Sequence, residues 1–250
     1  IARMLIEAGA NLNIQNDDDN TALMEAGIFY YENIVRILIE AGANLNIQND
    51  SGNTALINAS RMGHENIARM LIEAGANLNI QNEDGNTALI KAAAREIDTN
   101  TGRPRFRGVG SRENIVRMLI DNGADLNIQN NDGATALIEH LVGMLRQEED
   151  NDNFARILIE NGADIHIQDN DGDTAYGIAE EMGRVDIFDQ VRRHRLAQSL
   201  AWAGAMSQSN QPGHVSHLPY QLYQSIAEAL PPEQQHDKGR ISIIVWGWRD

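Results

Sequence analysis

The chain has no cysteine, which excludes disulfide bonds, cysteine-ligated zinc and thiol catalysis among its 250 residues. Proline is scarce and unevenly placed, since four of the five prolines lie at or after Pro212 and the fifth is Pro104. Aromatic residues make up only 5% of the sequence, so a core must be built from Leu, Ile and Ala. No run of 18 apolar residues occurs, and the sequence therefore predicts no membrane span.

Positive charge is also scarce. The 20 Lys and Arg residues stand against 36 Asp and Glu residues, which gives a formal net charge of −16 at pH 7. This balance argues against binding to nucleic acid or to an anionic membrane, because such surfaces need clustered Lys and Arg. The seven histidines are scattered, and no phosphate-binding loop, dinucleotide-binding glycine pattern or nucleophile elbow occurs. We therefore predict no metal, no cofactor and no catalytic residue.

What the sequence does contain is one polar phrase in five copies. GANLNIQN begins at Gly9, Gly42 and Gly75, and the related phrases GADLNIQN and GADIHIQD begin at Gly123 and Gly162. The first three copies are 33 residues apart, and the later intervals are 48 and 39 residues. A period between 20 and 50 residues indicates an architecture of stacked repeats.

Each repeat predicts two short helices and an extended finger, as residues 49–81 illustrate. Thr54 stands at the expected N-cap of the first helix, which Gly63 ends. The second helix is amphipathic and ends at Gly75, where a left-handed C-cap is expected. The repeated phrase then runs extended to the turn of the next finger. Helices of this length cannot bury their apolar faces alone, so neighbouring units must stack.

A second set of phrases supports a family resemblance. TALMEA, TALINA, TALIKA, TALIEH and TAYGIA begin at Thr21, Thr54, Thr87, Thr135 and Thr174. Together with GHENI, LIEAGANLN and the 33-residue period, they resemble the ankyrin repeat, whose usual phrase is Thr-Pro-Leu-His-x-Ala. The resemblance implies a mainly α solenoid of stacked helix-turn-helix units with extended β-turn fingers, and a non-enzymatic protein-binding role. The usual His is replaced here, so the family's His-mediated hydrogen bonds between neighbouring fingers are expected to be absent.

The sequence divides into three regions. Residues 1–197 are predicted to form the repeat array, with a partial first unit, about five further units, and insertions near 95–112 and 145–153. Residues 198–217 read as a linker, and residues 218–250 as a C-terminal helix followed by a strand. Because Ile1 already lies within a helical pattern, we expect the natural N-terminus to lie upstream.

Partner-contacting residues are predicted at finger positions that vary between units while the framework does not. These positions are Asp50, Ser51, Asn53, Glu83, Asp84, Asn86, Asn131 and Asp132. Four positions in the first helices are expected to extend the same surface. They are Arg61, Met62, Ala94 and Arg95.

The turn of the first full unit departs from the others. Phe29, Tyr30 and Tyr31 stand where the next unit has Met62, Gly63 and His64. Exposed Tyr and Phe side chains are typical of interface hot spots, so this stretch is a candidate partner-binding patch. The alternative is that these side chains contact an upstream part of the array.

The third unit carries an insertion rich in arginine. Its cationic and aromatic residues are Arg103, Arg105, Phe106, Arg107 and Arg112. Pro104, Gly108 and Gly110 are expected to exclude regular structure there. The loop either grips an acidic partner or a phosphate, or folds onto the chain's own acidic surface.

The tail carries an apolar stripe at Leu218, Leu222, Ile226 and Leu230, which predicts a short amphipathic helix. A helix this short needs support, either from the array near Phe188 or from a partner, and we favour the array. The stripe is also similar to the opening helix of F-box motifs, which implies recruitment of the linker subunit of cullin-type ubiquitin ligases.

Three functions follow from these features. The leading hypothesis is a cytoplasmic protein–protein interaction scaffold or adaptor, with a protein partner and no nucleic acid, membrane or metal. The first alternative is a substrate-recruiting subunit of a ubiquitin ligase, acting in the host cytoplasm if the chain is an effector of a virus or intracellular bacterium. The second is a structural array segment of a longer multidomain protein.

Overall fold

The structure is a computed structural model, and it describes residues 1–94, 109–145 and 153–189. The chain forms two compact units, Ile1–Arg184 and Val185–Asp250. In the described part of the second unit, Ile187 and Phe188 are buried. The predicted boundaries at residues 197 and 217 lie outside the described residues.

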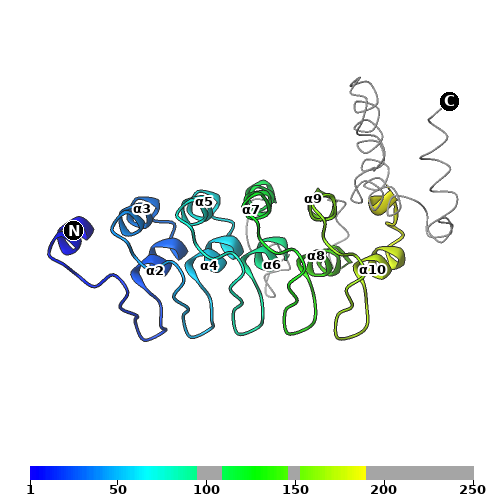
Figure 1. Ribbon diagram of the computed structural model, residues 1–250, viewed down its shortest axis with the longest axis horizontal. Helices are drawn as coiled ribbons and strands as arrows, with labels where there is room; N and C mark the ends of the chain where they lie inside the picture. The colour runs from blue at the N-terminus through cyan, green and yellow to red at the C-terminus, as the bar shows by residue number, and fades with distance from the viewer. Residues whose placement is uncertain (95–108, 146–152, 190–250) are drawn as a thin grey trace, which may run out of the picture. The chain divides into compact units, whose positions relative to one another are not determined.

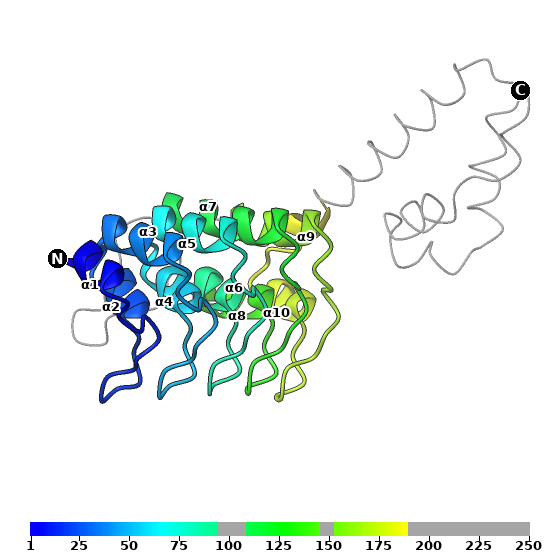
Figure 2. The ribbon, with the colours of Figure 1, turned by 60° about the vertical axis from the view of Figure 1, so that its left-hand side comes forward.

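The helices of the first unit form two layers. The inner layer contains α2 (Ala22–Ile28), α4 (Ala55–Met62), α6 (Ala88–Ala93), α8 (Ala136–Leu145) and α10 (Ala175–Glu181). The outer layer contains α1 (Ala2–Glu7), α3 (Glu32–Glu40), α5 (Glu65–Glu73), α7 (Val109–Asp121) and α9 (Asn153–Glu160). Helices of one layer pack side by side, and the inner helices α2, α4, α6 and α8 each pack on the outer helix that follows (Figures 1 and 2). The predicted solenoid of helix-turn-helix units is confirmed.

The core consists of small and aliphatic side chains, as the scarcity of aromatics predicts. Helix α4 packs on α5, and Leu56 and Ile57 of α4 and Ile67 and Leu71 of α5 are almost completely buried. Alanines occupy many of the remaining buried positions of the inner helices. Because alanine is small, helices of successive units approach closely, and each unit buries its apolar face against both neighbours.

Local capping explains where the inner helices begin and end. The Thr54 hydroxyl accepts a hydrogen bond from the Ile57 N–H at 3.2 Å, and the equivalent threonines cap α2, α6, α8 and α10 in the same way. Gly63 ends α4 in the left-handed region with φ of 70°. The capping predicted from sequence is confirmed at both ends of this helix.

The insertion of the third unit lies between the inner and outer helices, as expected, because α6 ends at Ala93 and α7 begins at Val109. One expectation was wrong. Gly110 does not exclude regular structure, since it lies in the first turn of α7. Glycine costs a helix only about 1 kcal/mol relative to alanine, and the packing of α7 on α5 and α6 overrides that preference.

Each finger is folded by its own asparagine. The Asn49 carboxamide oxygen accepts hydrogen bonds from the N–H groups of Ser51 and Asn53, at 3.2 and 2.8 Å. Asn16, Asn82, Asn130 and Asp169 make the same pair of bonds in the other fingers. The final residue of the repeated phrase therefore shapes the finger turn.

Neighbouring fingers are joined by glutamine and asparagine. The Gln48 carboxamide donates to the Gly52 carbonyl of its own finger at 2.7 Å and to the Gln81 carbonyl of the next finger at 3.0 Å. Gln15, Gln81 and Gln129 bond in the same way. The Asn46 carboxamide oxygen accepts from the Asn77 N–H of the next unit at 2.9 Å. These contacts, which we call the amide ladder, link the fingers without the histidine of the usual family phrase.

Candidate functional site

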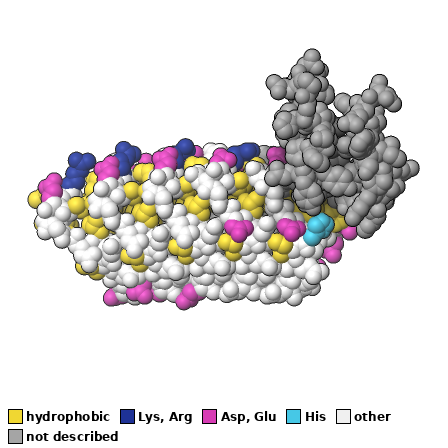
Figure 3. Space-filling model, viewed as in Figure 1, with side chains coloured by type: hydrophobic (Ala, Val, Ile, Leu, Met, Phe, Trp, Pro, Cys, Tyr) yellow, Lys and Arg dark blue, Asp and Glu magenta, His cyan; other side chains and the backbone are white. Residues whose placement is uncertain are grey.

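The fingers form one exposed edge of the array (Figure 2). From each cap glycine to the next threonine, the finger sequences contain no Lys or Arg. Carboxylates are exposed along this edge at Asp50, Glu83, Asp84 and Asp132. On the face shown in Figure 3, Lys and Arg side chains lie over the outer helices together with Asp and Glu, whereas the charged side chains seen along the finger edge are Asp and Glu. The finger edge is therefore anionic.

The predicted finger residues fall into two groups. Those with exposed side chains are Asp50, Ser51, Glu83, Asp84, Asn131 and Asp132. Asn53 is half-buried and Asn86 is 6% exposed. Their carboxamide oxygens accept hydrogen bonds from Asn82 and Asn130 of the following finger, at 3.0 and 3.3 Å. Asn53 and Asn86 therefore belong to the framework, and we remove them from the candidate contact residues.

The predicted inner-helix residues lie elsewhere than expected. Arg61 and Met62 form the C-terminal end of α4, whereas the finger leads into its N-terminus at Thr54. Eight helical residues separate these ends by roughly 12 Å. Ala94 follows α6 at the same far end, and Arg95 lies outside the described residues. Arg61, Met62 and Ala94 do not extend the finger edge; they belong to a second edge, formed by the turns between inner and outer helices, which we call the turn edge.

Three adjacent aromatic residues project from the turn edge between α2 and α3. Phe29, Tyr30 and Tyr31, which we call the aromatic turn, are 61%, 49% and 59% exposed. The rings of Phe29 and Tyr31 stack with their centroids 6.1 Å apart. Tyr30 has φ of 60°, and the equivalent residue of the next unit is Gly63 with φ of 70°. A bulky residue in this region is strained, typically by about 1–3 kcal/mol, unless its surroundings hold it there.

The second unit supplies the contacts that hold Tyr30. Its ring lies against His64 with the centroids 4.7 Å apart, and the His64 ring is fixed by a 2.9 Å hydrogen bond between Nδ1 and the Gly27 carbonyl. Asn66 of the second unit donates to the Glu32 carboxylate at 2.8 Å, and the pKa of the Tyr30 hydroxyl is raised by its interaction with that carboxylate. The aromatic turn is therefore a rigid feature.

Hydrogen bonds at this cluster shift the acidity of two groups. Donation from Asn66 and then from Tyr30 lowers the pKa of the Glu32 carboxyl below its usual value, and the charge of Arg36 adds to the effect. The hydrogen bond to Glu32 raises the pKa of the Tyr30 hydroxyl, and desolvation and the charge of Glu32 act in the same direction. At neutral pH the cluster therefore carries a carboxylate and a neutral phenol.

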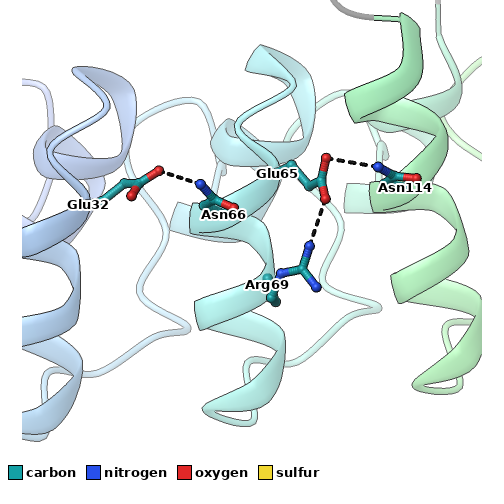
Figure 4. Close-up of polar contacts among 5 residues, drawn as sticks. All are labelled: Glu32, Glu65, Asn66, Arg69 and Asn114. Carbon is teal, nitrogen blue, oxygen red and sulfur yellow. Dashed lines mark hydrogen bonds and ion pairs between the residues drawn. The ribbon is translucent and has the colours of Figure 1, made fainter.

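Glutamates recur at the start of the outer helices, but their partners differ (Figure 4). Glu65 accepts from Arg69 of its own helix at 2.7 Å and from Asn114 of the next unit at 2.9 Å. Glu113 is paired in the same way with Arg117 at 3.0 Å. Glu32 accepts from Asn66 of the next unit at 2.8 Å, and among the described residues the charge of Arg36 acts on it without a close ion pair. Sequence reasoning missed this role of Glu32, although the sequence Glu-Asn-Ile recurs at Glu32, Glu65 and Glu113 and marks the position.

One arginine predicted in the insertion has a structural role. The Arg112 guanidinium donates to the Ala94 carbonyl at 2.8 Å and to the Arg61 carbonyl at 3.2 Å. It therefore caps the C-terminal ends of α6 and α4, where a positive charge is favourable. The other candidate residues of the insertion and tail lie outside the described residues. They are Arg103, Arg105, Phe106, Arg107, Leu218, Leu222, Ile226 and Leu230.

The histidine of the fourth unit, His140, serves packing. His140 is fully buried, its ring stacks on Phe154 with the centroids 5.0 Å apart, and Nδ1 lies 3.3 Å from the Ala93 carbonyl. Within the part of the chain that the structure describes, no group of three or more His, Cys, Asp or Glu residues is arranged to hold a metal ion. No helix there is long and apolar enough to cross a membrane.

Comparison with known families agrees with this geometry. Residues 1–82 and 108–195 match the profile of the family described as ankyrin repeats in three copies. Residues 84–131 match the profile described as ankyrin repeat. The two profiles together cover almost the whole of the predicted array. No curated protein shows a significant sequence match to the chain.

Proposed function

The chain belongs to the ankyrin-repeat family, and we propose that it is a non-enzymatic scaffold or adaptor that binds a protein partner through its finger edge and turn edge. Ankyrin repeats generally mediate protein–protein interactions, and proteins of the family are typically interaction modules. A cytoplasmic location is part of this proposal.

The observation that carries the proposal is a separation of tasks within each finger. The glutamines and asparagines of the repeated phrase are used in the amide ladder. The tip residues, such as Asp50, Glu83 and Asp132, project into solvent and differ from unit to unit. Tip residues can therefore be matched to a partner without disturbing the fold. A row of fingers also offers the roughly 800 Å² that a specific interface needs on each side, which a single finger cannot.

A charge-matched pair of variants tests the finger edge. The finger variant replaces Asp50, Glu83, Asp84 and Asp132 with serine, and the control variant replaces four exposed acids of the outer layer with serine. Those acids are Glu7, Glu40, Glu73 and Asp121. Proteins captured by each immobilised variant are quantified by mass spectrometry, and the principal captured protein is then purified and titrated calorimetrically. We expect the finger variant to bind it at least tenfold more weakly and the control to bind as the unaltered chain does. Equal binding by both variants would contradict the use of the finger edge.

The ubiquitin-ligase hypothesis rests on Leu218, Leu222, Ile226 and Leu230, and it stays a prediction from the sequence. Leu222→Asp should abolish capture of the ligase linker subunit while leaving the melting temperature of the array unchanged. If the unaltered chain never captures that subunit, the hypothesis is wrong. If residues 218–250 instead dock on the array, their deletion should lower its melting temperature.

A further inference from the structure

The aromatic turn combines exposure with rigidity. Phe29 and Tyr31 offer stacked ring faces to solvent, and Tyr30 fixes their position because its ring and hydroxyl are both held by neighbours. Rigid aromatic side chains lose little conformational entropy on binding, which makes them effective anchors. The aromatic turn is thus a preorganised binding surface.

The adjacent carboxylate has acceptor capacity to spare. An ionised carboxylate offers about four lone-pair positions, and Glu32 uses some of them for Asn66 and Tyr30. Glu32 is only partly covered, so solvent reaches this residue, which directly follows the exposed Tyr31 in the sequence. The turn therefore presents an anionic acceptor next to exposed ring faces.

The array itself shows what complements this carboxylate. In the next unit, the Arg69 guanidinium lies against Glu65 at 2.7 Å, and in the third unit Arg117 lies against Glu113 at 3.0 Å. At Glu32 the corresponding close pair with Arg36 is not formed among the described residues, although the charge of Arg36 acts on the carboxyl, and the aromatic turn immediately precedes this glutamate. A guanidinium can stack on an aromatic ring while it donates to a carboxylate, which an ammonium group does less well.

We propose that the aromatic turn, together with Glu32, is a receptor for an arginine side chain of a protein partner. The guanidinium stacks on the exposed ring of Phe29 or Tyr31 and donates to the Glu32 carboxylate, in the role that Arg69 has at Glu65. This inference rests on the proposed function, because it names the chemistry of the partner at the turn edge. An acidic segment is repelled at this site, and a purely apolar segment leaves the Glu32 carboxylate without its additional donor.

The experiment uses the full chain and four synthetic heptapeptides. Each peptide has one leucine on each side of a central residue. The central residue is arginine in the first peptide, citrulline (its neutral analogue) in the second, lysine in the third and glutamate in the fourth. Binding is followed by ¹H–¹⁵N spectra of the chain. We expect the arginine peptide to shift the amide signals of residues 29–32 and 64–66. It should bind at least fivefold more tightly than the citrulline and lysine peptides. The glutamate peptide should show no detectable binding.

Two glutamate variants separate the site from general attraction to an acidic protein. Glu32→Gln should lower the affinity for the arginine peptide at least fivefold, to the affinity measured for the citrulline peptide. Its carboxamide oxygen still accepts from Asn66 and Tyr30, so folding is preserved. Glu65→Gln is the matched control, because Arg69 and Asn114 already occupy that carboxylate. It should change the affinity less than twofold. Replacing Phe29 and Tyr31 with serine should remove binding of the arginine and citrulline peptides alike.

Three outcomes would overturn the inference. Equal affinity for the arginine and citrulline peptides would show that the positive charge of the guanidinium does not contribute to binding. Shifts spread along the finger edge would indicate general attraction to the acidic chain. Shifts of residues 29–32 that depend on protein concentration without peptide would assign the aromatic turn to contact between copies of the chain. Each of these results leaves the capture experiment at the finger edge intact, since its variants do not alter residues 29–32.

Discussion

Two residues at the same place in successive units show how backbone conformation governs this fold. Tyr30 and Gly63 both adopt positive φ, and only Tyr30 needs outside contacts to remain there. Glycine positions differ in a similar way. Gly42 and Gly52 both have positive φ, but a Cβ added at Gly42 meets nothing within 4 Å, whereas one at Gly52 would lie 2.6 Å from the Glu83 nitrogen. Glycine is therefore required at Gly42 by the positive φ alone, and at Gly52 by the positive φ and by the close approach of the next finger.

These two glycines give a matched pair of substitutions. Gly42→Ala should lower the free energy of unfolding by about 1–2 kcal/mol, the cost of left-handed geometry for a residue with a Cβ. Gly52→Ala should cost at least about 1 kcal/mol more, because the neighbouring finger must also move. Urea denaturation followed by circular dichroism measures both. Equal losses would show that the fingers are not packed as closely as described.

The Glu32 cluster predicts a titration. The pKa of Glu32 should lie below its usual value of about 4.5, and Asn66→Ala should raise it more than Tyr30→Phe does, because the Asn66 bond is the larger cause. A carboxyl whose pKa is lowered by folding stabilises the native state above the unfolded pKa, and this stabilisation is lost as pH falls through the folded pKa. Side-chain carbonyl NMR between pH 2 and 7 measures the shift. An unchanged pKa in the Asn66→Ala variant would contradict the hydrogen bond.

At the scale of the element, the finger is held by turn hydrogen bonds and side-chain bonds rather than by a sheet. Its β-pairing among the described residues is limited to isolated bridges, at Gln15–Thr21 and Gln168–Thr174. Backbone hydrogen bonds join neighbouring finger tips, such as that from the Glu83 N–H to the Ser51 carbonyl at 3.2 Å. The amide ladder adds to them, because each ladder glutamine donates within its finger and to the next one. Fingers so joined keep a constant spacing, and the tip residues are thereby presented at regular intervals.

Gln81→Glu should break the ladder at its centre. Glutamate cannot donate to the Gly85 and Gln129 carbonyls, so two hydrogen bonds are lost and a negative charge faces both acceptors. We expect a loss of about 1–3 kcal/mol in the free energy of unfolding. Gln168→Glu is the control, since the Gln168 side chain makes no hydrogen bond to a described residue, and it should change stability by less than about 0.5 kcal/mol. Equal effects of the two substitutions would contradict the ladder.

At the scale of the whole array, burial rises from the N-terminal end towards the interior. Leu5 of α1 is 56% exposed, whereas the equivalent Leu38 and Leu71 are 4% and 0% exposed. Helix α1 packs against α3 and buries none of its residues completely. Because each unit is stabilised mainly by its neighbours, stability should follow the same gradient.

Equivalent leucines measure that gradient. Leu71→Ala should lower the free energy of unfolding by about 2–5 kcal/mol, because it opens a cavity between packed helices. Leu5→Ala should cost less than about 1 kcal/mol, because the side chain is already largely solvated. Urea denaturation of both variants provides the comparison. Similar costs at the two sites would show that α1 is covered in solution.

The candidate surfaces were predictable only in part. The aromatic turn was found because it breaks the repeat pattern, and the exposed tip residues were found because they vary within it. Asn86 varies between units as the exposed tip residues do, but it is buried and accepts a hydrogen bond from the next finger, which variation alone did not reveal. Glu32 was missed because its importance depends on which donor reaches it, and Glu65 with the same sequence context has a different donor.

The sequence by itself determined the repeat, the helix ends and the aliphatic core, because these depend on residues a few positions apart, such as Thr54 and Ile57. Only the tertiary structure decided which polar groups are used and which are free. The bond from Gln48 to Gln81 spans 33 residues, and that from Arg112 to Arg61 spans 51. Stacking brings these groups within hydrogen-bonding distance, and their partners depend on the spacing and rotation of whole units, which no local pattern specifies.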